Sequence, residues 1–243
     1  MKNQRIIEGL QSLNEKGLTL ISVLDTQTLP SSLKEGISEQ EIALDEYPRL
    51  VVLANGGGNL WKTFSADRPV VEPPLDHYSI QITSQFFESF LPHVPNIRLY
   101  PQAHQLPIQQ LSRFAGWSFP SPLGMDIHPE FGLWYAYRAI YLVGSELPLF
   151  NDAYTKSPCD DCKEKPCFPA CPSGAVQGIE KFDTSKCIPH RLTKDSECAE
   201  TYLARLACPI GLQHQYSAEQ ISFHYLYSLH AYQRYYAEQK TSP

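Results

Sequence analysis

The sequence predicts an α+β fold in two parts, a sheet with flanking helices in residues 1–150 and a cysteine-rich region in residues 151–243. The apolar run 50–53 is typical of a buried strand. Segments 3–14 and 76–91 carry apolar residues at helical spacing. After residue 146 long apolar runs become rare, and all seven cysteines lie beyond that point.

The first elements follow from their local patterns. Apolar residues on one face predict a helix over 3–14: Ile6, Ile7, Leu10 and Leu13. A strand is expected within 17–25 and a loop over 29–36. The strand at 48–55 ends in Gly56, Gly57 and Gly58, which form either a strand-to-helix turn with N–H groups free for an anion or a flexible turn.

The next elements lead to a hairpin. A helix over 76–91 has Asp76 as its cap, a strand covers 96–101, and a helix over 106–117 has Pro107 in its first turn. Residues 124–143 then predict a strand to His128, a turn at 129–132 and a second strand from Leu133 to Val143.

The second strand of that hairpin carries a charge among apolar neighbours. Alternation places five side chains on one face: Trp134, Ala136, Arg138, Ile140 and Leu142. A guanidinium buried on such a face needs an anionic or carbonyl partner. The tail predicts a tyrosine-rich helix with Ser217 and Gln220 as a capping box.

Bulk properties restrict the setting. A chain of 243 residues buries a core without disulfides, and an odd number of cysteines cannot pair completely. No secretory signal or membrane-spanning run is visible, so a cytoplasmic location is expected. The net charge of −6 and the scattered Lys and Arg residues make nucleic acid an unlikely partner.

The cysteine spacing favours an iron–sulfur site. Residues 159–172 follow the pattern C-x2-C-x4-C-x3-C-P, close to the bacterial ferredoxin run C-x2-C-x2-C-x3-C-P. A distant Cys-Pro step completes such a cluster, and Cys208-Pro209 provides one. One [4Fe–4S] cluster is therefore expected on Cys159, Cys162, Cys167 and Cys208.

The remaining thiols leave a second cluster open. Cys171, Cys187 and Cys198 are available, and Thr201 and Ala204 stand where a two-cluster ferredoxin would have cysteines. A second cluster would need His190 or solvent as a further ligand. Zinc and a metal-free loop are the alternatives for the whole region; only one C-x2-C unit is present, and crowded free thiols oxidise readily.

Three stretches carry a family resemblance. "GMDIHPEFGLWYAYRAIYLV" and "QYSAEQISFHY" resemble segments of the CblC-type cobalamin-processing proteins. The cysteine block resembles the ferredoxin portion of epoxyqueuosine reductase, and "LPIQQLSRFAGW" is similar to the helix before the hairpin in both. The resemblance implies a nitroreductase-like α+β sheet that binds base-off cobalamin, followed by a ferredoxin-like region.

The resemblance also implies site residues. His128 would lie beside the corrin, Arg138 matches the arginine that receives glutathione in the CblC type, and Tyr137 is a candidate cofactor contact. His104 occupies the place of a catalytic aspartate, which weakens the case for the queuosine reaction. Each of these residues also has a structural alternative. His128 could cap a turn, Arg138 could form an ion pair, Tyr137 could pack in the sheet, and His104 could lie at the surface.

The expected function is that of an oxidoreductase in which an iron–sulfur cluster passes electrons to cobalamin, for upper-ligand removal or a corrinoid-dependent reduction. An electron-donating reductase and a small-molecule substrate are the expected partners, and a flavin is a further candidate cofactor. Two other classes stay open: an iron–sulfur electron-transfer protein without corrinoid, and a cobalamin trafficking protein with a structural cluster.

Overall fold

The computed structural model describes residues 2–38, 42–66, 71, 73–101, 106–151 and 153–241. The chain divides into two compact units. The first comprises Met1–Ser118 and Tyr135–Thr155, and the second comprises Phe119–Trp134 and Lys156–Pro243. A single boundary is expected at residue 150, whereas the structure assigns 119–134, the first half of the expected hairpin, to the second unit. The strand expected up to His128 is absent there, and only isolated bridges form.

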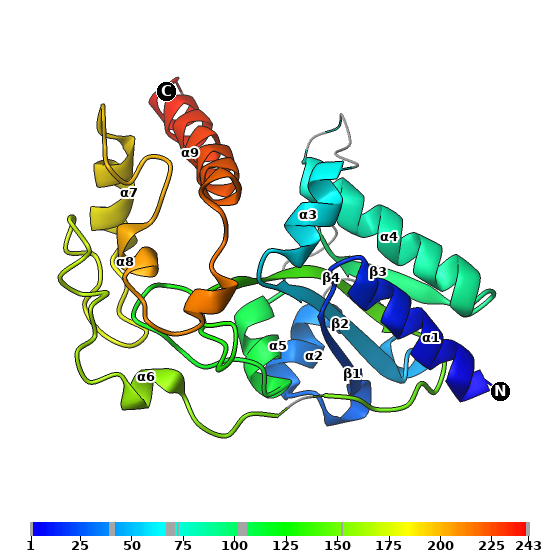
Figure 1. Cartoon of the computed structure of the whole chain (residues 1–243). Coiled ribbons are helices and arrows are strands. Elements are labelled where there is room, and N and C mark those ends of the chain that lie inside the picture. Colours follow the sequence, from blue (N-terminus) through cyan, green and yellow to red (C-terminus); the bar gives the residue numbers. More distant parts are fainter. Residues whose placement is uncertain are drawn as a thin grey trace. The chain divides into compact units, whose positions relative to one another are not determined.

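The first unit is built on a four-stranded antiparallel sheet (Figure 1). Its strands, in the spatial order β1-β2-β4-β3, are β1 (Leu20–Asp25), β2 (Arg49–Gly56), β4 (Tyr135–Val143) and β3 (Asn96–Tyr100). In β2 every residue from Leu50 to Gly56 is buried. This confirms the strand expected from the apolar run, because a central strand covered on both faces needs consecutive apolar residues.

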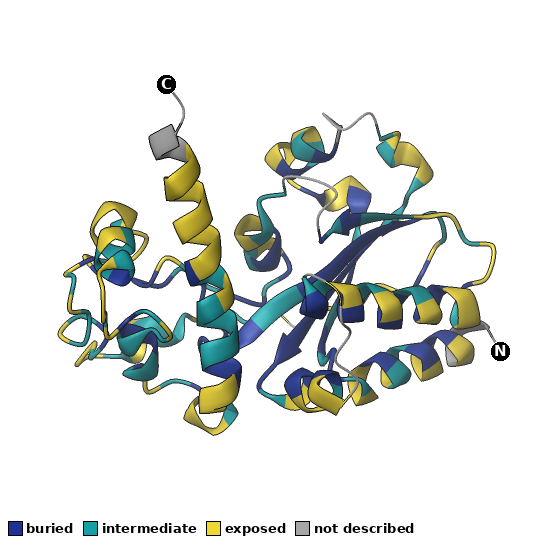
Figure 2. Cartoon of the chain, turned by 90° about the horizontal axis from the view of Figure 1, so that it is seen from above, coloured by how far each residue is buried: buried dark blue, intermediate teal, exposed yellow. Residues whose placement is uncertain are grey.

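Helices cover both faces of this sheet, and each has a buried side and an exposed side (Figure 2). They are α1 (Lys2–Glu15), α2 (Ser31–Ser38), α3 (Asn59–Ala66), α4 (Pro74–Phe90) and α5 (Ile108–Phe114), with short 3-10 turns at Thr26–Thr28 and Leu44–Glu46. Helix α4 packs on β4, where the Thr83 and Tyr141 hydroxyls lie 2.8 Å apart. Helix α1 packs against α4, and an added Cβ on Gly9 would lie 2.7 Å from the Phe86 and Phe90 rings.

Three local expectations were wrong. Residues 31–38 form helix α2 rather than a loop, and Ser31 and Ser32 begin this helix. Asp76 lies inside the first turn of α4, whose N-cap is Pro73, and Pro107 is the N-cap of α5. The three glycines lead from strand β2 into helix α3, but the Gly56 N–H is not free for an anion, since it donates to the Thr19 hydroxyl at 2.9 Å.

A β-bulge at Arg138 breaks the alternation expected along the last strand. Leu53 pairs with Ala139 and Ala54 pairs with Tyr137, so Arg138 has no partner residue in β2. Trp134 lies before the strand and in the second unit, so the proposed common face of five residues does not form. Bulges redirect side chains locally, and here the redirected side chain is the guanidinium.

The second unit contains short helices joined by turns. They are α6 (Pro158–Asp161), α7 (Thr184–Leu192), α8 (Leu203–Leu206), a 3-10 turn at Leu212–His214 and the long α9 (Ala218–Thr241). The Gln220 N–H donates to the Ser217 hydroxyl at 3.2 Å, which confirms the serine half of the expected capping box. No helix of the described residues is long and apolar enough to cross a membrane.

Candidate metal centre

Four thiols from distant parts of the sequence line one cavity in the second unit. Cys159 and Cys162 lie on and directly after α6, Cys167 lies in the following turn, and Cys208 follows α8. Helix α6 begins where the Ser157 hydroxyl accepts the Cys159 N–H at 3.2 Å. The set is the one expected from the spacing, including the long return to Cys208, and all four thiols are free.

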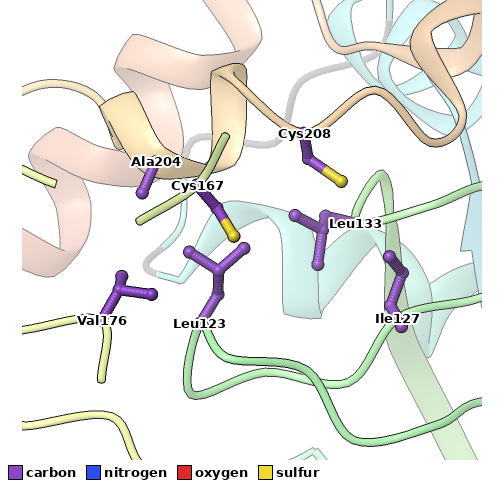
Figure 3. Packing of buried hydrophobic residues seen from close by; sticks show 7 residues of the cluster. All are labelled: Leu123, Ile127, Leu133, Cys167, Val176, Ala204 and Cys208. Carbon is purple, nitrogen blue, oxygen red and sulfur yellow. The ribbon is translucent and has the colours of Figure 1, made fainter. Parts of the chain in front are cut away.

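The surroundings of this cavity are apolar (Figure 3). Cys167 and Cys208 are each 8% exposed and pack with buried residues from three segments of the chain: Leu123, Ile127, Leu133, Val176 and Ala204. Burial raises the pKa of the Cys159 thiol to about 11, and the neighbouring thiols of Cys208, Cys167 and Cys162 act in the same direction. Such thiols are neutral unless a metal takes the place of the proton.

The cavity is tight. Its free volume is about 20 Å³, little more than a single water needs. Among the described residues, no three His, Cys, Asp or Glu side chains converge closely enough to hold a single metal ion.

The turn before Leu133 holds the Cys208 segment in place. His128 and Gly132 exchange backbone hydrogen bonds of 2.8 Å, which closes a tight turn. A Cβ on Gly132 would lie 2.0 Å from the Ile210 carbonyl oxygen, and one on Gly211 would lie 2.5 Å from Phe131 backbone atoms. The two backbones thus touch where only glycine fits, two and three residues after Cys208.

A buried arginine anchors the helix before Cys208. Arg205 is 8% exposed, and it donates to the Leu133 carbonyl at 2.5 Å. Its guanidinium lies 4.4 Å from the Trp134 ring centroid and 5.1 Å from that of Tyr216. Sequence analysis missed this residue; the only available signal was an arginine three positions before the Cys-Pro step.

A second, larger cavity in the same unit gathers the other three thiols. Cys171, Cys187 and Cys198 line it, and its volume is about 260 Å³. His190, Arg191 and Thr201 line it as well. Burial raises the pKa of the Cys187 thiol; nearby Arg191 opposes this rise, and Cys171 and Cys198 add to it.

The predicted corrin-facing histidine is fully buried and supports a turn. Its Nδ1 accepts the N–H groups of Glu130 and Phe131 at 3.1 and 3.2 Å. Burial lowers the pKa of His128 to about 4, and His214 nearby acts in the same direction. Since Nδ1 is an acceptor, the neutral ring carries its proton on Nε2. This geometry matches the turn-capping role weighed for His128.

Arg138 lies in the first unit with neighbours that the sequence did not reveal. Its Nε donates to the Asn55 side-chain oxygen at 2.6 Å, and the residue is 8% exposed. Burial raises the pKa of the nearby Asp76 carboxyl, an effect that Arg138 opposes. One sign in the sequence that Asn55 could belong to a site is its position directly before the glycines of "NGGG". Tyr137 lies 3.3 Å from Tyr135, hydroxyl to hydroxyl, and His104 falls outside the described residues.

Comparisons with known proteins place the fold. None of the family models matches the sequence, and no curated protein matches it. Epoxyqueuosine reductase bound to a tRNA stem loop is similar over 91% of this chain and 69% of its own, with a TM-score of 0.59 and 14% identity. The Bacillus subtilis enzyme covers 90% of this chain and 68% of its own, with a TM-score of 0.57 and 16% identity.

A catabolic reductive dehalogenase with bound 3-bromo-4-hydroxybenzoic acid is also similar, with a TM-score of 0.52 and 12% identity, over 89% of this chain and 33% of its own. The chain thus spans about two thirds of the reductases and one third of the dehalogenase. The likeness shows the fold, a mixed α/β fold shared with epoxyqueuosine reductase. The expectation that nucleic acid is an unlikely partner finds no support, because one of these proteins holds a tRNA stem loop.

Proposed function

We propose that this chain is an iron–sulfur redox protein that binds cobalamin in its base-off form and acts as a corrinoid-dependent oxidoreductase. Its first unit is then nitroreductase-like and its second ferredoxin-like. The observation that carries the proposal is the convergence of Cys208 with Cys159, Cys162 and Cys167 on one cavity. Nothing but folding brings Cys208 to thiols that precede it by more than forty positions.

The donor set suits a [4Fe–4S] cluster. Four thiols, a Cys-Pro step and an aliphatic lining match the way such clusters are held and shielded from water. Bound cluster supplies one-electron transfer, and bound cobalamin supplies a redox-active cobalt for upper-ligand removal or a reductive step. The chain's own contribution is to fix the thiols and exclude solvent. An electron-donating reductase is the required partner, and a flavin could serve it.

Arg138 supports the corrinoid part. It sits at a bulge in a buried strand, and among the described residues only its Nε has a hydrogen-bond acceptor, Asn55. The remaining guanidinium N–H groups therefore suit the carbonyl or phosphate oxygens of an amphiphilic ligand. The fold likeness to a reductive dehalogenase and to epoxyqueuosine reductase supports redox chemistry of this kind.

The test begins with anaerobic purification and the quantification of iron, sulfide and cobalt. We expect iron and sulfide in the wild type and their loss from the four-thiol site in Cys208→Ser. Added cobalamin should change from its base-on to its base-off absorption spectrum, and Arg138→Met should weaken this change at least tenfold in affinity. Iron that survives Cys208→Ser unchanged would contradict the cluster assignment.

The same samples separate the two other classes. Cobalamin that stays base-on beside an intact cluster would identify an electron-transfer protein without corrinoid. Cobalamin that binds base-off and is processed equally well by wild type and Cys162→Ser would identify a trafficking protein whose cluster is structural. The proposed oxidoreductase instead keeps cobalamin binding and loses electron transfer to cobalt in Cys162→Ser.

A further inference from the structure

The three thiols of the second cavity lack a fourth cysteine. Cys171, Cys187 and Cys198 come from three separate segments, and the pKa values of Cys187 and Cys198 both respond to Cys171. The cavity between them holds about 260 Å³, far more than the four-thiol cavity. Three thiols and a histidine that line one cavity of this size suit a polynuclear cluster in which each iron takes one protein ligand.

We propose that His190 is the fourth ligand of a second [4Fe–4S] cluster, through its Nε2 atom, so that this site is held by three cysteines and one histidine. The proposal rests on the iron–sulfur part of the proposed function. Nε2 of His190 is buried, and it has no hydrogen-bond partner in the part of the chain that the structure describes. A buried ring nitrogen without a partner is costly, and a metal ligand relieves that cost.

The helix places this histidine beside a thiol. Cys187 and His190 are three residues apart on α7, and both line the cavity. Side chains at this spacing lie on the same face of a helix. Helix α7 would thus provide two ligands, Cys187 and His190. Cys171 and Cys198, from loops, would provide the other two.

Two other polar side chains at the cavity, Arg191 and Tyr202, already make hydrogen bonds elsewhere. Arg191 carries no acceptor, and it donates to the carbonyls of Cys198, Ala199 and Tyr225. The Tyr202 hydroxyl donates to the Leu123 carbonyl at 3.2 Å. The further polar groups that line the cavity, Thr201 among them, are hydroxyls, and a hydroxyl is a much weaker ligand for iron than imidazole. Arg191 thereby fixes the Cys198 segment and adds positive charge beside the cluster.

A neutral imidazole in place of a thiolate removes one negative charge from the site. The reduction potential of such a cluster rises, as it does where histidines replace cysteines in Rieske centres. The site with His190 should therefore be reduced more easily than the four-thiol site. A cysteine at position 190 should lower its potential.

The test compares wild type, His190→Ala, His190→Cys and, as a matched change in the same cavity, Thr201→Ala. We expect about eight iron atoms per chain in the wild type. Pulsed EPR of the reduced protein should show nitrogen coupling from a coordinated imidazole. This coupling should vanish in both His190 variants and persist in Thr201→Ala.

The two His190 variants should differ from each other. His190→Ala should lose about one iron per chain on oxidation and give the EPR signal of a three-iron cluster. His190→Cys should keep its iron and show a lower midpoint potential, which also demonstrates that the variant folds. An unchanged nitrogen signal in His190→Ala, or loss of it in Thr201→Ala alone, would overturn the proposal.

Iron content separates this proposal from the proposed function. About four iron atoms per chain, unaffected by the His190 changes but lost in Cys208→Ser, would overturn the second site and leave the first intact. A wild-type protein without iron would overturn both.

Discussion

At the scale of single residues, two buried arginines of the second unit, Arg205 and Arg191, hold chain segments in place. Arg205 combines a hydrogen bond to the Leu133 carbonyl with two aromatic faces, Trp134 and Tyr216. These contacts fix the helix that leads into Cys208. Arg191 has the same function for the Cys198 segment.

Arg205→Ala should destabilise the second unit by about 3 kcal/mol, because it removes a charged hydrogen bond and two cation–π contacts from a buried site. Thermal unfolding under anaerobic conditions measures the effect, and iron content should fall with it. Arg234→Ala, an exposed change on α9, is the control and should leave both unchanged. Equal stability of the two variants would contradict the anchoring role.

His128 predicts a pH dependence of stability. Its pKa falls from 6.5 to about 4 on folding, so the unfolded chain takes up a proton first as the pH decreases. The stability contribution is complete above pH 6.5 and is lost progressively as the pH falls towards 4. Between pH values of about 7.5 and 5.5 the loss from this group should be about 1 kcal/mol.

His128→Asn keeps an acceptor for the Glu130 and Phe131 N–H groups without a titrating ring. Urea unfolding at the two pH values should therefore show a smaller decrease for this variant than for the wild type. The same decrease in both proteins would mean that other groups cause it.

At the scale of elements, two turns in close contact set the position of the Cys208 segment. Gly132 has a φ of +59°, and its added Cβ would meet the Ile210 carbonyl oxygen. Gly174 has a φ of +63° but has nothing within 4 Å of that position. The two glycines therefore share a backbone conformation that is strained for other residues. They differ in the room that is available for a side chain.

Gly174→Ala should cost about 1 kcal/mol through its backbone conformation alone. Gly132→Ala should cost clearly more, because the turn and the Ile210 backbone must separate, and it should lower the iron content of the four-thiol site. Melting temperatures and iron content of the two variants test this. Similar values for both would show that the contact between the turns does not position Cys208.

At the scale of the whole molecule, the two units differ in the interactions that stabilise each of them. The first buries a sheet between helices. The second has short helices and a small buried cluster in which two of the seven members are the proposed ligands Cys167 and Cys208. Metal binding contributes directly to the folding of such small cores.

Iron removal with an anaerobic chelator should therefore expose the second unit to proteases and leave the first resistant. We expect new cleavage sites within residues 156–201 and little change in strands β1, β2 and β4, as mapped by mass spectrometry of the fragments. Identical cleavage with and without iron would contradict a stabilising role of the clusters.

The sequence by itself determined the four strands of the sheet, the long helices and the close spacing of Cys159, Cys162 and Cys167, because apolar periodicity and short cysteine intervals are local signals. Helix α2 escaped it, because serines suit both loops and helix starts. Only the tertiary structure decided that Cys208 reaches the other three thiols, that Arg138 lies at a bulge beside Asn55, and that His190 shares a cavity with Cys171, Cys187 and Cys198. These facts depend on packing between segments far apart in the chain, which no local pattern encodes.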